Sequence, residues 1–150
     1  MKKAIFGLLF MVMATAQVVL AADRVNVSSW AKKAFEKQFP NAQYAKWYEL
    51  NESELYAVSF GYEEQNMLAY VDRTGIVLAT VRNVEIDHVP FPVKESITKR
   101  YAGFNVVKIE ELSMESDVSY LVQLENGKKQ IGIRVYPGGS YYELKKKKVK

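Results

Sequence analysis

The chain has 150 residues, no cysteine and a single histidine, and its formal net charge is +4. The absence of cysteine excludes disulfides, thiol nucleophiles and thiolate metal sites, so a packed core has to supply the stability. The positive charge lies at the two ends: without Lys2 and Lys3 the net charge falls from +4 to +2, and without the five lysines among residues 145–150 it falls from +2 to −3. A nucleic-acid-binding protein should carry its basic residues on a face of the folded part, so this pattern argues against nucleic acid as a partner.

The first 22 residues have the order of parts found in an export signal. Two lysines precede an apolar run over residues 4–13, and small residues at positions 21 and 22 suit cleavage. A membrane anchor is the alternative, but Thr15 and Gln17 interrupt the apolar stretch and no stop-transfer pattern follows it. No cysteine follows the run, which excludes lipid attachment there. We therefore predict residues 1–22 as a signal peptide and a periplasmic or secreted protein that begins at Ala22 or Asp23.

The rest of the chain repeats itself. Residues 31–50 align without a gap on residues 93–112, and a second block, residues 56–75, aligns on residues 120–139. Two extra residues are expected in a longer loop of the second copy, at residues 113–118. A repeat of this kind predicts a tandem duplication of one small unit. The aligned positions include the identical pairs Lys32/Lys94, Lys46/Lys108 and Glu49/Glu111 and the apolar pairs Phe35/Ile97, Ala45/Val107, Trp47/Ile109, Tyr56/Tyr120 and Val71/Val135.

The first repeat, residues 23–82, is predicted to begin with one helix. Ser28 or Ser29 can cap this helix, and Pro40 ends it just after Phe39. Strands are predicted to follow, since apolar residues then recur at every second position, with turn residues such as those at 72–75 between the runs. The apolar stripe of the helix consists of Trp30, Ala31, Ala34 and Phe35.

The second repeat, residues 92–150, has the same order of elements. Pro92 suits the first helical position, Val93, Ile97 and Tyr101 recur at four-residue spacing, and Gly103 suits a left-handed helix end. Strand runs follow, with turns at residues 126–127 and 137–139. Residues 83–91, which contain the only histidine, are predicted as a linker of restricted conformation. The predicted fold class is therefore α+β, a tandem duplication of a helix plus a four-stranded antiparallel meander, with both helices on one face of the sheet and the other face open.

The second repeat ends in lysines, and we predict these as a solvated tail. Such a tail makes at most weak contact with an anionic membrane surface. The alternative, which we favour over membrane contact, is that the lysines protect the exposed edge of the last strand from pairing with another chain.

No catalytic or cofactor site is predicted. His88 has no cysteine to pair with and lies on a linker, where no motif marks a serine and a carboxylate beside it. The adjacent carboxylates Glu63 and Glu64 should point to opposite faces of a strand, so they cannot act together on one atom. One histidine and no cysteine leave little for a metal site, and no glycine-rich turn precedes a helix as a phosphate loop does. We therefore predict no catalytic residue, no metal and no cofactor.

The candidate site is the open face of the sheet. If Tyr56, Val58 and Val71 face the helix, strand alternation sends their neighbours to the other side. The same alternation buries Ala45 and Trp47 in the first strand, matching Val107 and Ile109 in the second repeat. Tyrosine and arginine on an open sheet are typical of a surface that binds a protein or peptide, although a β-rich surface or a dimer contact has the same composition. The predicted binding face consists of Tyr44, Tyr48, Leu68, Tyr70, Arg134, Tyr136 and Tyr141.

Two strings carry a resemblance to a known family: KKAFEKQFPNAQYAKWYEL at residues 32–50 and VPFPVKESITKRYAGFNVVKIEEL at residues 89–112. With the repeat and the export signal, they make the chain similar to the PepSY-like exported bacterial proteins, which are related in architecture to the β-lactamase-inhibitor-like fold. The family's second helix commonly ends in Tyr-Pro-Gly, and Ala102 stands where that proline would be. The resemblance implies a periplasmic or secreted module without enzymatic activity, one that binds or inhibits another exported protein such as a peptidase.

Two hypotheses for function follow. The first is a protein-binding or inhibitory module that uses the open sheet face. The alternative is a binder of a small ligand, peptide or glycan in a groove between the two repeats. An enzyme is a third and weaker interpretation, since no catalytic constellation is present. The sequence leaves the oligomeric state and the identity of the partner open.

Overall fold

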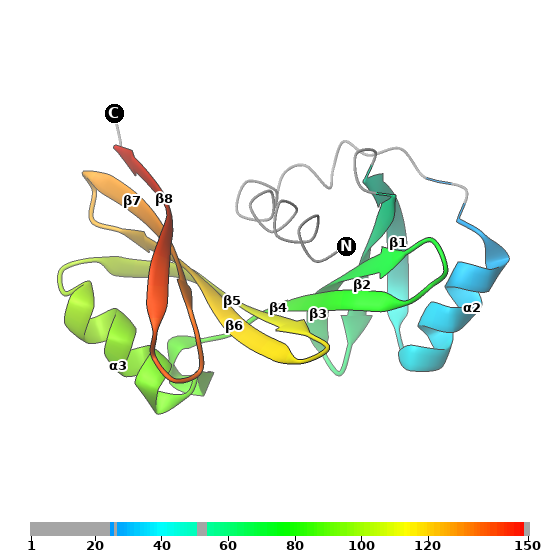
Figure 1. Cartoon of the computed structure of the whole chain (residues 1–150), viewed down its shortest axis with the longest axis horizontal. Coiled ribbons are helices and arrows are strands. Elements are labelled where there is room, and N and C mark those ends of the chain that lie inside the picture. Colours follow the sequence, from blue (N-terminus) through cyan, green and yellow to red (C-terminus); the bar gives the residue numbers. More distant parts are fainter. Residues whose placement is uncertain (1–24, 26, 51–53, 149–150) are drawn as a thin grey trace. The chain divides into compact units, whose positions relative to one another are not determined.

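The computed structural model describes residues 25, 27–50 and 54–148 (Figure 1). The predicted signal peptide lies outside the described residues. The chain divides into two compact units, Met1–Val81 and Arg82–Lys150, and each is described here by itself. Unit 1 has helix α2 (Ser29–Gln38) and strands β1 (Gln43–Leu50), β2 (Leu55–Tyr62), β3 (Gln65–Asp72) and β4 (Val77–Asn83), the last of which reaches into unit 2. Unit 2 has a short 3₁₀ helix (Ile86–His88), helix α3 (Phe91–Arg100) and strands β5 (Asn105–Met114), β6 (Asp117–Glu125), β7 (Lys129–Val135) and β8 (Tyr141–Lys148).

The eight strands form one antiparallel sheet in chain order, from β1 to β8. The predicted fold class is thus confirmed: each of the two helices is followed by four antiparallel strands. No helix within the described ranges is long and apolar enough to span a membrane.

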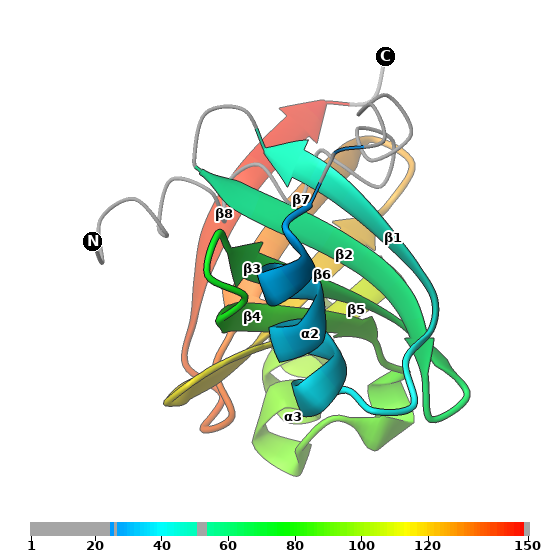
Figure 2. The same cartoon turned by 90° about the vertical axis from the view of Figure 1, so that its right-hand side faces the viewer.

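Helix α2 begins and ends where the sequence predicts. The Ser28 Oγ accepts a hydrogen bond from the Ala31 N–H at 3.1 Å, which caps the first turn, and Pro40 lies just beyond the last one. Helix α2 lies against the strands of its unit (Figure 2), and its residues Ala31 and Phe35 are fully buried in the core there. Their spacing of four residues places both on one side of the helix.

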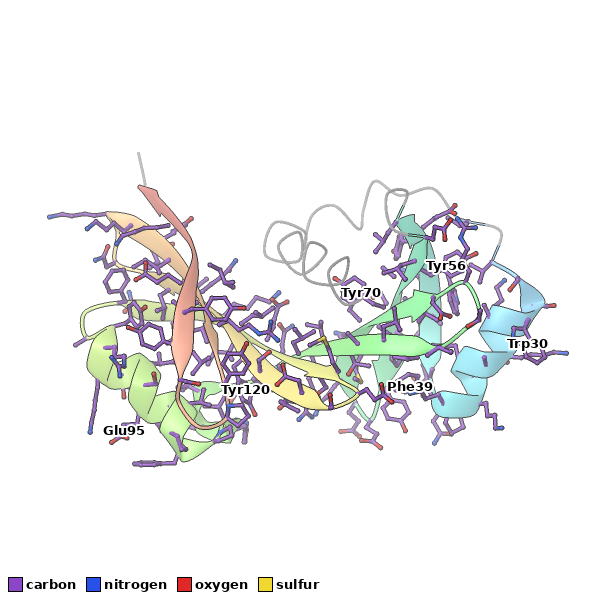
Figure 3. The ribbon with its side chains drawn as sticks, viewed as in Figure 1. Trp30, Phe39, Tyr56, Tyr70, Glu95 and Tyr120 are labelled. Atoms are coloured by element: carbon purple, nitrogen blue, oxygen red, sulfur yellow. The ribbon has the colours of Figure 1, made fainter. Side chains whose placement is uncertain are left out.

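Trp30 was predicted on the same stripe, and this prediction is wrong. Its side chain is 72 % exposed and lies on the outer side of α2 (Figure 3). The turn after β3 packs directly on the helix, because a Cβ added to Gly75 would lie 2.6 Å from the Ala34 Cβ and 3.0 Å from the Ala31 Cα. Only alanine-sized side chains fit at this contact. Trp30 lies about 100° around the helix from Ala31 and about 140° from Phe35, which directs the indole away from the buried side.

An aromatic cluster fills the core of unit 1. The ring of Phe35 lies 5.0 Å from that of Phe60, 5.1 Å from that of Phe39 and 5.3 Å from that of Trp47. Edge-to-face contacts at these distances add to the burial of apolar area. The strands contribute the residues that alternation predicted for the helix side, and Met67 packs against the cluster while remaining half-buried. The buried strand residues are Tyr56, Val58, Phe60, Ala69 and Val71.

Unit 2 has an aliphatic core in the same place. Val93 and Ile97 of α3 are buried against β5, β6 and β7. The helix begins at Phe91, one residue earlier than predicted, and Pro92 is still in the first turn, where no N–H is needed for the helix. The strand residues on this side are Ile109, Tyr120, Val122, Leu124, Ile131, Ile133 and Val135.

Each unit carries a β-bulge in its first strand, and the bulges correct the prediction that Ala45 and Val107 are buried. The pairing of β1 with β2 shifts between Gln43 and Lys46, and that of β5 with β6 shifts between Val106 and Lys108. An extra residue in one strand interrupts the alternation of faces. Ala45 and Val107 are exposed as a result, and alternation resumes with Trp47, which is half-buried, and Ile109, which is buried.

The two extra residues of the second repeat do not form the longer loop predicted at residues 113–118. Ser113 pairs with Val118 and Met114 pairs with Asp117, so only two residues remain for the turn. The insertion therefore lengthens a hairpin, and it places Asp117 within a strand.

The lysine-rich end is a strand rather than a solvated tail. Lys145 pairs with Gly132, and the register continues to Lys148 opposite Lys129. β8 is the last strand of the sheet. This agrees with the alternative interpretation, in which lysines discourage an exposed edge from pairing with another chain.

We predict that Phe35→Ala lowers the free energy of unfolding by about 3–5 kcal/mol, as truncation of a buried aromatic side chain does. Phe35 is 1 % exposed and makes three ring contacts. Phe91→Ala is the matched control on the other helix, because Phe91 is 73 % exposed; its effect should stay within about 0.5 kcal/mol. Chemical denaturation of both variants measures the difference, and equal losses would contradict the assignment of the core.

We also predict that deletion of residues 145–150 destabilises unit 2. The deletion removes the backbone pairs of Lys145–Lys148 with β7, and the lost ladder should cost about 1–2 kcal/mol. Replacement of the same four lysines by glutamine keeps the backbone and should leave the melting temperature nearly unchanged. A truncated protein that melts with the wild type would show that this part of β8 adds no stability.

Candidate partner-binding surface

The face of each unit opposite its helix, called the non-helix face below, is the predicted binding surface. In unit 2 the residues of this face alternate along each strand with the core residues. Leu121 of β6 pairs with Arg134 of β7, and the residues before and after each of them belong to the core. The face is well packed, since Leu112, Ser119, Leu121 and Arg134 are each no more than 2 % exposed. The predicted open face therefore includes a second set of buried side chains in this unit.

Arg134 is the centre of this set. Its side chain is 1 % exposed, and its Nε donates a hydrogen bond to the Ser119 Oγ at 2.8 Å. One terminal nitrogen donates to the Asp117 Oδ2 at 3.2 Å, and the other donates to the Tyr142 hydroxyl at 3.4 Å. The guanidinium carbon lies 5.2 Å from the centre of the Tyr136 ring. Arg134 thus holds three strands and a ring together, and the expectation that it is accessible to a partner is wrong.

The accessible groups beside Arg134 are two tyrosines. Tyr136 is half-buried and Tyr142 is 37 % exposed, and their ring centres are 6.2 Å apart. Burial raises the pKa of Tyr136, the charge of Arg134 opposes this increase, and the neighbouring Tyr142 adds to it. The Tyr136 hydroxyl therefore stays protonated at neutral pH and can act as a hydrogen-bond donor. The arginine fixes the two rings as one rigid aromatic patch.

Tyr141 was predicted on the same face, and the structure corrects this. It pairs with Val135, a core residue, and residues directly opposite on neighbouring strands share a face. Tyr141 accordingly packs on the helix side, with its ring 5.9 Å from that of Tyr101 and the Arg100 guanidinium 4.9 Å above it. Burial, together with Glu143 and Tyr141, raises the pKa of Tyr101 to about 12.

The non-helix face of unit 1 carries a row of tyrosines. Tyr48 of β1 pairs with Ala57 of β2, and Ala57 pairs with Tyr70 of β3, so a small residue separates two large ones. Tyr70 is 7 % exposed and lies on the other side of the strands from α2 (Figure 3), while Tyr48 and Leu68 are half-buried. The structure thus brings three of the predicted residues together, but Tyr70 is buried, so the expectation that its side chain is accessible to a partner is wrong. Tyr70 corresponds to Arg134 in the alignment of the two repeats, so both units place a large amphipathic side chain at this position.

Tyr44 lies apart from that row. It sits at the bulge of β1 with a φ of 55° and is 86 % exposed. A left-handed backbone at a bulky non-glycine residue costs free energy, which the ladder on either side has to offset. Tyr44 is available to a partner, but the bulge separates it from the regular part of the face.

Several surface residues escaped the sequence analysis. Tyr142 was missed because its face depends on the register of the turn after β7, where the Tyr136 N–H donates to the Ser140 carbonyl. Ile76 and Phe91 are 60 % and 73 % exposed at the turn after β3 and at the start of α3. No pattern in the sequence marks them, since an isolated apolar residue in a turn predicts neither face.

Within the described part of the chain, no three His, Asp or Glu side chains gather to hold a metal ion. His88 is exposed on the 3₁₀ helix, beside the ion pair of Lys94 and Asp87 that lowers the pKa of the Asp87 carboxyl. Glu63 and Glu64 were expected on a strand but form the turn between β2 and β3, with φ values of 48° and 61°.

Comparison with solved structures decides the fold family. A BLIP-like protein from Bacteroides fragilis superposes with a TM-score of 0.70 at 21 % identity, over 83 % of this chain and 88 % of its own. A DUF2874 family protein from Bacteroides ovatus gives a TM-score of 0.70 at 16 % identity, over 83 % and 89 %. A protein from Bacteroides eggerthii, described as a candidate periplasmic protein, gives 0.71 at 14 % identity, over 83 % and 90 %.

The chain has a BLIP-like fold. The predicted resemblance to the β-lactamase-inhibitor-like architecture is therefore confirmed at the level of fold. No family model matches the chain, and no curated protein sequence matches it. Identities of 14–21 % establish the fold alone, and the function has to be argued from the surface.

We predict that Arg134→Gln raises the pKa of Tyr136 further. The positive charge of Arg134 stabilises the phenolate, so its removal leaves burial and Tyr142 to act unopposed. Arg134→Lys retains the charge and should give a Tyr136 pKa nearer to that of the wild type. Ionisation of Tyr136 can be followed by NMR of ring carbons, with Tyr136→Phe assigning the signal. An unchanged pKa in the Gln variant would show that the guanidinium does not act on this ring.

Proposed function

We propose that this protein is an exported module without enzymatic activity that binds another envelope protein, and inhibits or sequesters it, through the non-helix face. The observation that carries the proposal is the tyrosine pair Tyr136 and Tyr142, which the buried Arg134 holds in place. Rigid aromatic side chains contribute contact area at low entropic cost, and they commonly dominate the energy of protein interfaces.

The chemistry of this patch fits a protein partner better than a reaction. Its charged groups already pair with each other, since Arg134 is matched by Asp117, Ser119 and Tyr142. A group whose hydrogen bonds are satisfied inside the protein does not bind a substrate atom, but it does fix the shape of the surface above it. The faces of the two tyrosine rings suit apolar side chains of a partner, and their polar hydroxyl ends suit its peptide groups.

Unit 1 supplies a second tyrosine-rich area of the same kind. Tyr48, Leu68 and Tyr70 occupy neighbouring positions on its non-helix face, and Tyr44 protrudes at the bulge. The pairs Tyr48/Glu110 and Tyr70/Arg134 are equivalent in the two repeats but differ in residue type. The two units therefore offer different surfaces to a partner despite their common fold.

The similar structures support the proposal. One of them is described as a BLIP-like protein, a fold that suggests a protein-binding, inhibitor-like module, and another as a candidate periplasmic protein. Export of this chain rests on residues 1–22, whose lysines and apolar run predict a signal peptide. Another exported protein such as a peptidase is the partner class that the sequence resemblance implies.

We predict that Tyr136→Ala combined with Tyr142→Ala lowers affinity for the native partner by about 30-fold or more, since two aromatic contacts of this type are worth about 2 kcal/mol together. The partner is first identified by photo-crosslinking from position 142 in intact cells, and its affinity for each purified variant is then measured by titration calorimetry. Trp30→Ala combined with Phe91→Ala is the control, because these exposed aromatics lie outside the non-helix face.

Equal affinity of the double tyrosine variant and the wild type, with both folded, would contradict the proposed surface. An equal loss in the Trp30 and Phe91 control would point to general exposed aromatic area instead. The alternative function, a small-ligand, peptide or glycan binder with a groove between the repeats, stays a prediction of the sequence. It predicts that a glycan or peptide raises the melting temperature equally in both double variants.

A further inference from the structure

The outer side of α3 carries a groove that the proposed function does not use. It has a volume of about 320 Å³ and lies entirely within unit 2. Glu95 marks it on the outer side of the helix (Figure 3). A volume of this size is at the lower end of those that hold small ligands. The helix contributes Pro92, Glu95, Ser96, Lys99 and Arg100, and the turn after β7 contributes Gly138 and Gly139.

One end of the groove is closed by backbone. A Cβ added to Gly139 would lie 2.8 Å from the Pro92 carbonyl oxygen, so this turn packs directly on the first turn of the helix. Gly139 has a φ of 85°, which glycine adopts without strain. A Cβ added to Gly138 would meet no atom within 4 Å. This end therefore presents an uncharged wall of proline and open main chain.

Arg100 lies at the other end and is unusual among the arginines of the described residues. Its guanidinium carbon lies 4.9 Å from the centre of the Tyr141 ring. Arg73, Arg82 and Arg134 each pair with a carboxylate, whereas Arg100 makes no hydrogen bond or ion pair in the described part of the chain. Stacking on an aromatic ring orients a guanidinium while leaving its N–H donors free in the ring plane.

The neighbouring charges narrow the class of ligand. Lys99 is tied to Glu95 by an ion pair of 2.6 Å, so the groove holds two cations and one carboxylate. A phosphate dianion prefers several unopposed cations, and its double charge makes the Glu95 carboxylate repel it more strongly than it repels a single carboxylate. A single carboxylate matches the two-pronged guanidinium, and the amide N–H groups of a peptide can donate to Glu95.

We propose that this groove binds a peptide carboxylate, with Arg100 as the main contact and the wall of Pro92 and Gly138 beside the uncharged peptide chain. Tyr141 acts as a positioning residue, because it holds the guanidinium before the ligand arrives and so lowers the entropic cost of binding. The free Ser96 hydroxyl lies between the two ends and can donate a further hydrogen bond to the ligand. The site is on the helix side and is separate from the non-helix face.

Titration of the isotope-labelled mature protein with acetyl-Gly-Glu, followed by amide NMR, tests the proposal. Shifts should concentrate at α3 and at residues 138–141. Arg100→Gln should weaken binding by about tenfold or more, as loss of a charged hydrogen-bond donor does. Lys128→Gln is the matched control, because it removes the same charge from an exposed position on the turn before β7. Ser96→Trp fills the groove without a change of charge and should abolish binding.

Three results would overturn the inference. One is an equal loss in Lys128→Gln and Arg100→Gln, which means attraction to net charge alone. Another is equal binding of the uncharged acetyl-Gly-Gln-amide, which means that no carboxylate is recognised. The third is tighter binding of inorganic phosphate than of acetyl-Gly-Glu at the same residues, which means that the class of ligand is wrong. Selective binding of the carboxylate that Arg100→Gln and Ser96→Trp remove would establish the site.

Discussion

The burial of one helix face against three strands is the constraint on which both units depend. Phe35 in α2 and Ile97 in α3 are almost fully buried against strand residues of their own unit. Once a helix covers one face, every second residue of each strand has to be apolar, and a slip by one residue would turn the core outward. The residues that remain for the opposite face are fixed by the same alternation. Any binding function of the sheet therefore depends on the residues that the helices leave uncovered.

The two units solve the same packing problem with different side chains. Unit 1 uses aromatic rings around Phe35, and unit 2 uses aliphatic residues around Ile97. On the non-helix face the difference is larger, since Tyr70 in unit 1 stands where unit 2 has the buried Arg134. A buried arginine is tolerated only when its donors are satisfied, and Ser119, Asp117 and Tyr142 satisfy them here. The hairpin that is lengthened by two residues supplies one of these partners, Asp117.

Two arginines of unit 2 show how position decides the role of one residue type. Arg134 is 1 % exposed and fully paired, so it supports the tyrosines above it. Arg100 is exposed and stacked on Tyr141, with its donors free, so it can act on a ligand. Both stack on a tyrosine, and the difference lies in whether a neighbouring strand offers a carboxylate. The tyrosine patch above Arg134 thus lies on the non-helix face of β6, β7 and β8, and the Arg100 groove lies on the helix side of the same unit.

The sequence by itself determined the duplication, the two helices, the Ser28 cap of the first helix, the strand order within each repeat and nearly all core residues. These follow from local periodicity, which a linear pattern contains. Tertiary structure alone decided where alternation is interrupted and where close packing excludes a large side chain. The bulges expose Ala45 and Val107, and the contact of Gly75 with α2 leaves room only for alanine-sized side chains at Ala31 and Ala34. No sequence pattern marks either the bulges or the close contact, because each depends on the strand or turn that lies opposite.

The candidate site was predicted only in part for the same reason. Alternation placed Tyr48, Leu68 and Tyr70 correctly on one face, since the strands between them are regular. It failed for Tyr141, because the pairing of Tyr141 with Val135 places it on the helix side. It also could not show that Arg134 is buried. Exposure depends on what neighbouring strands place around a side chain. The sequence specifies which residues share a face, and only the folded chain decides which of them a partner can reach.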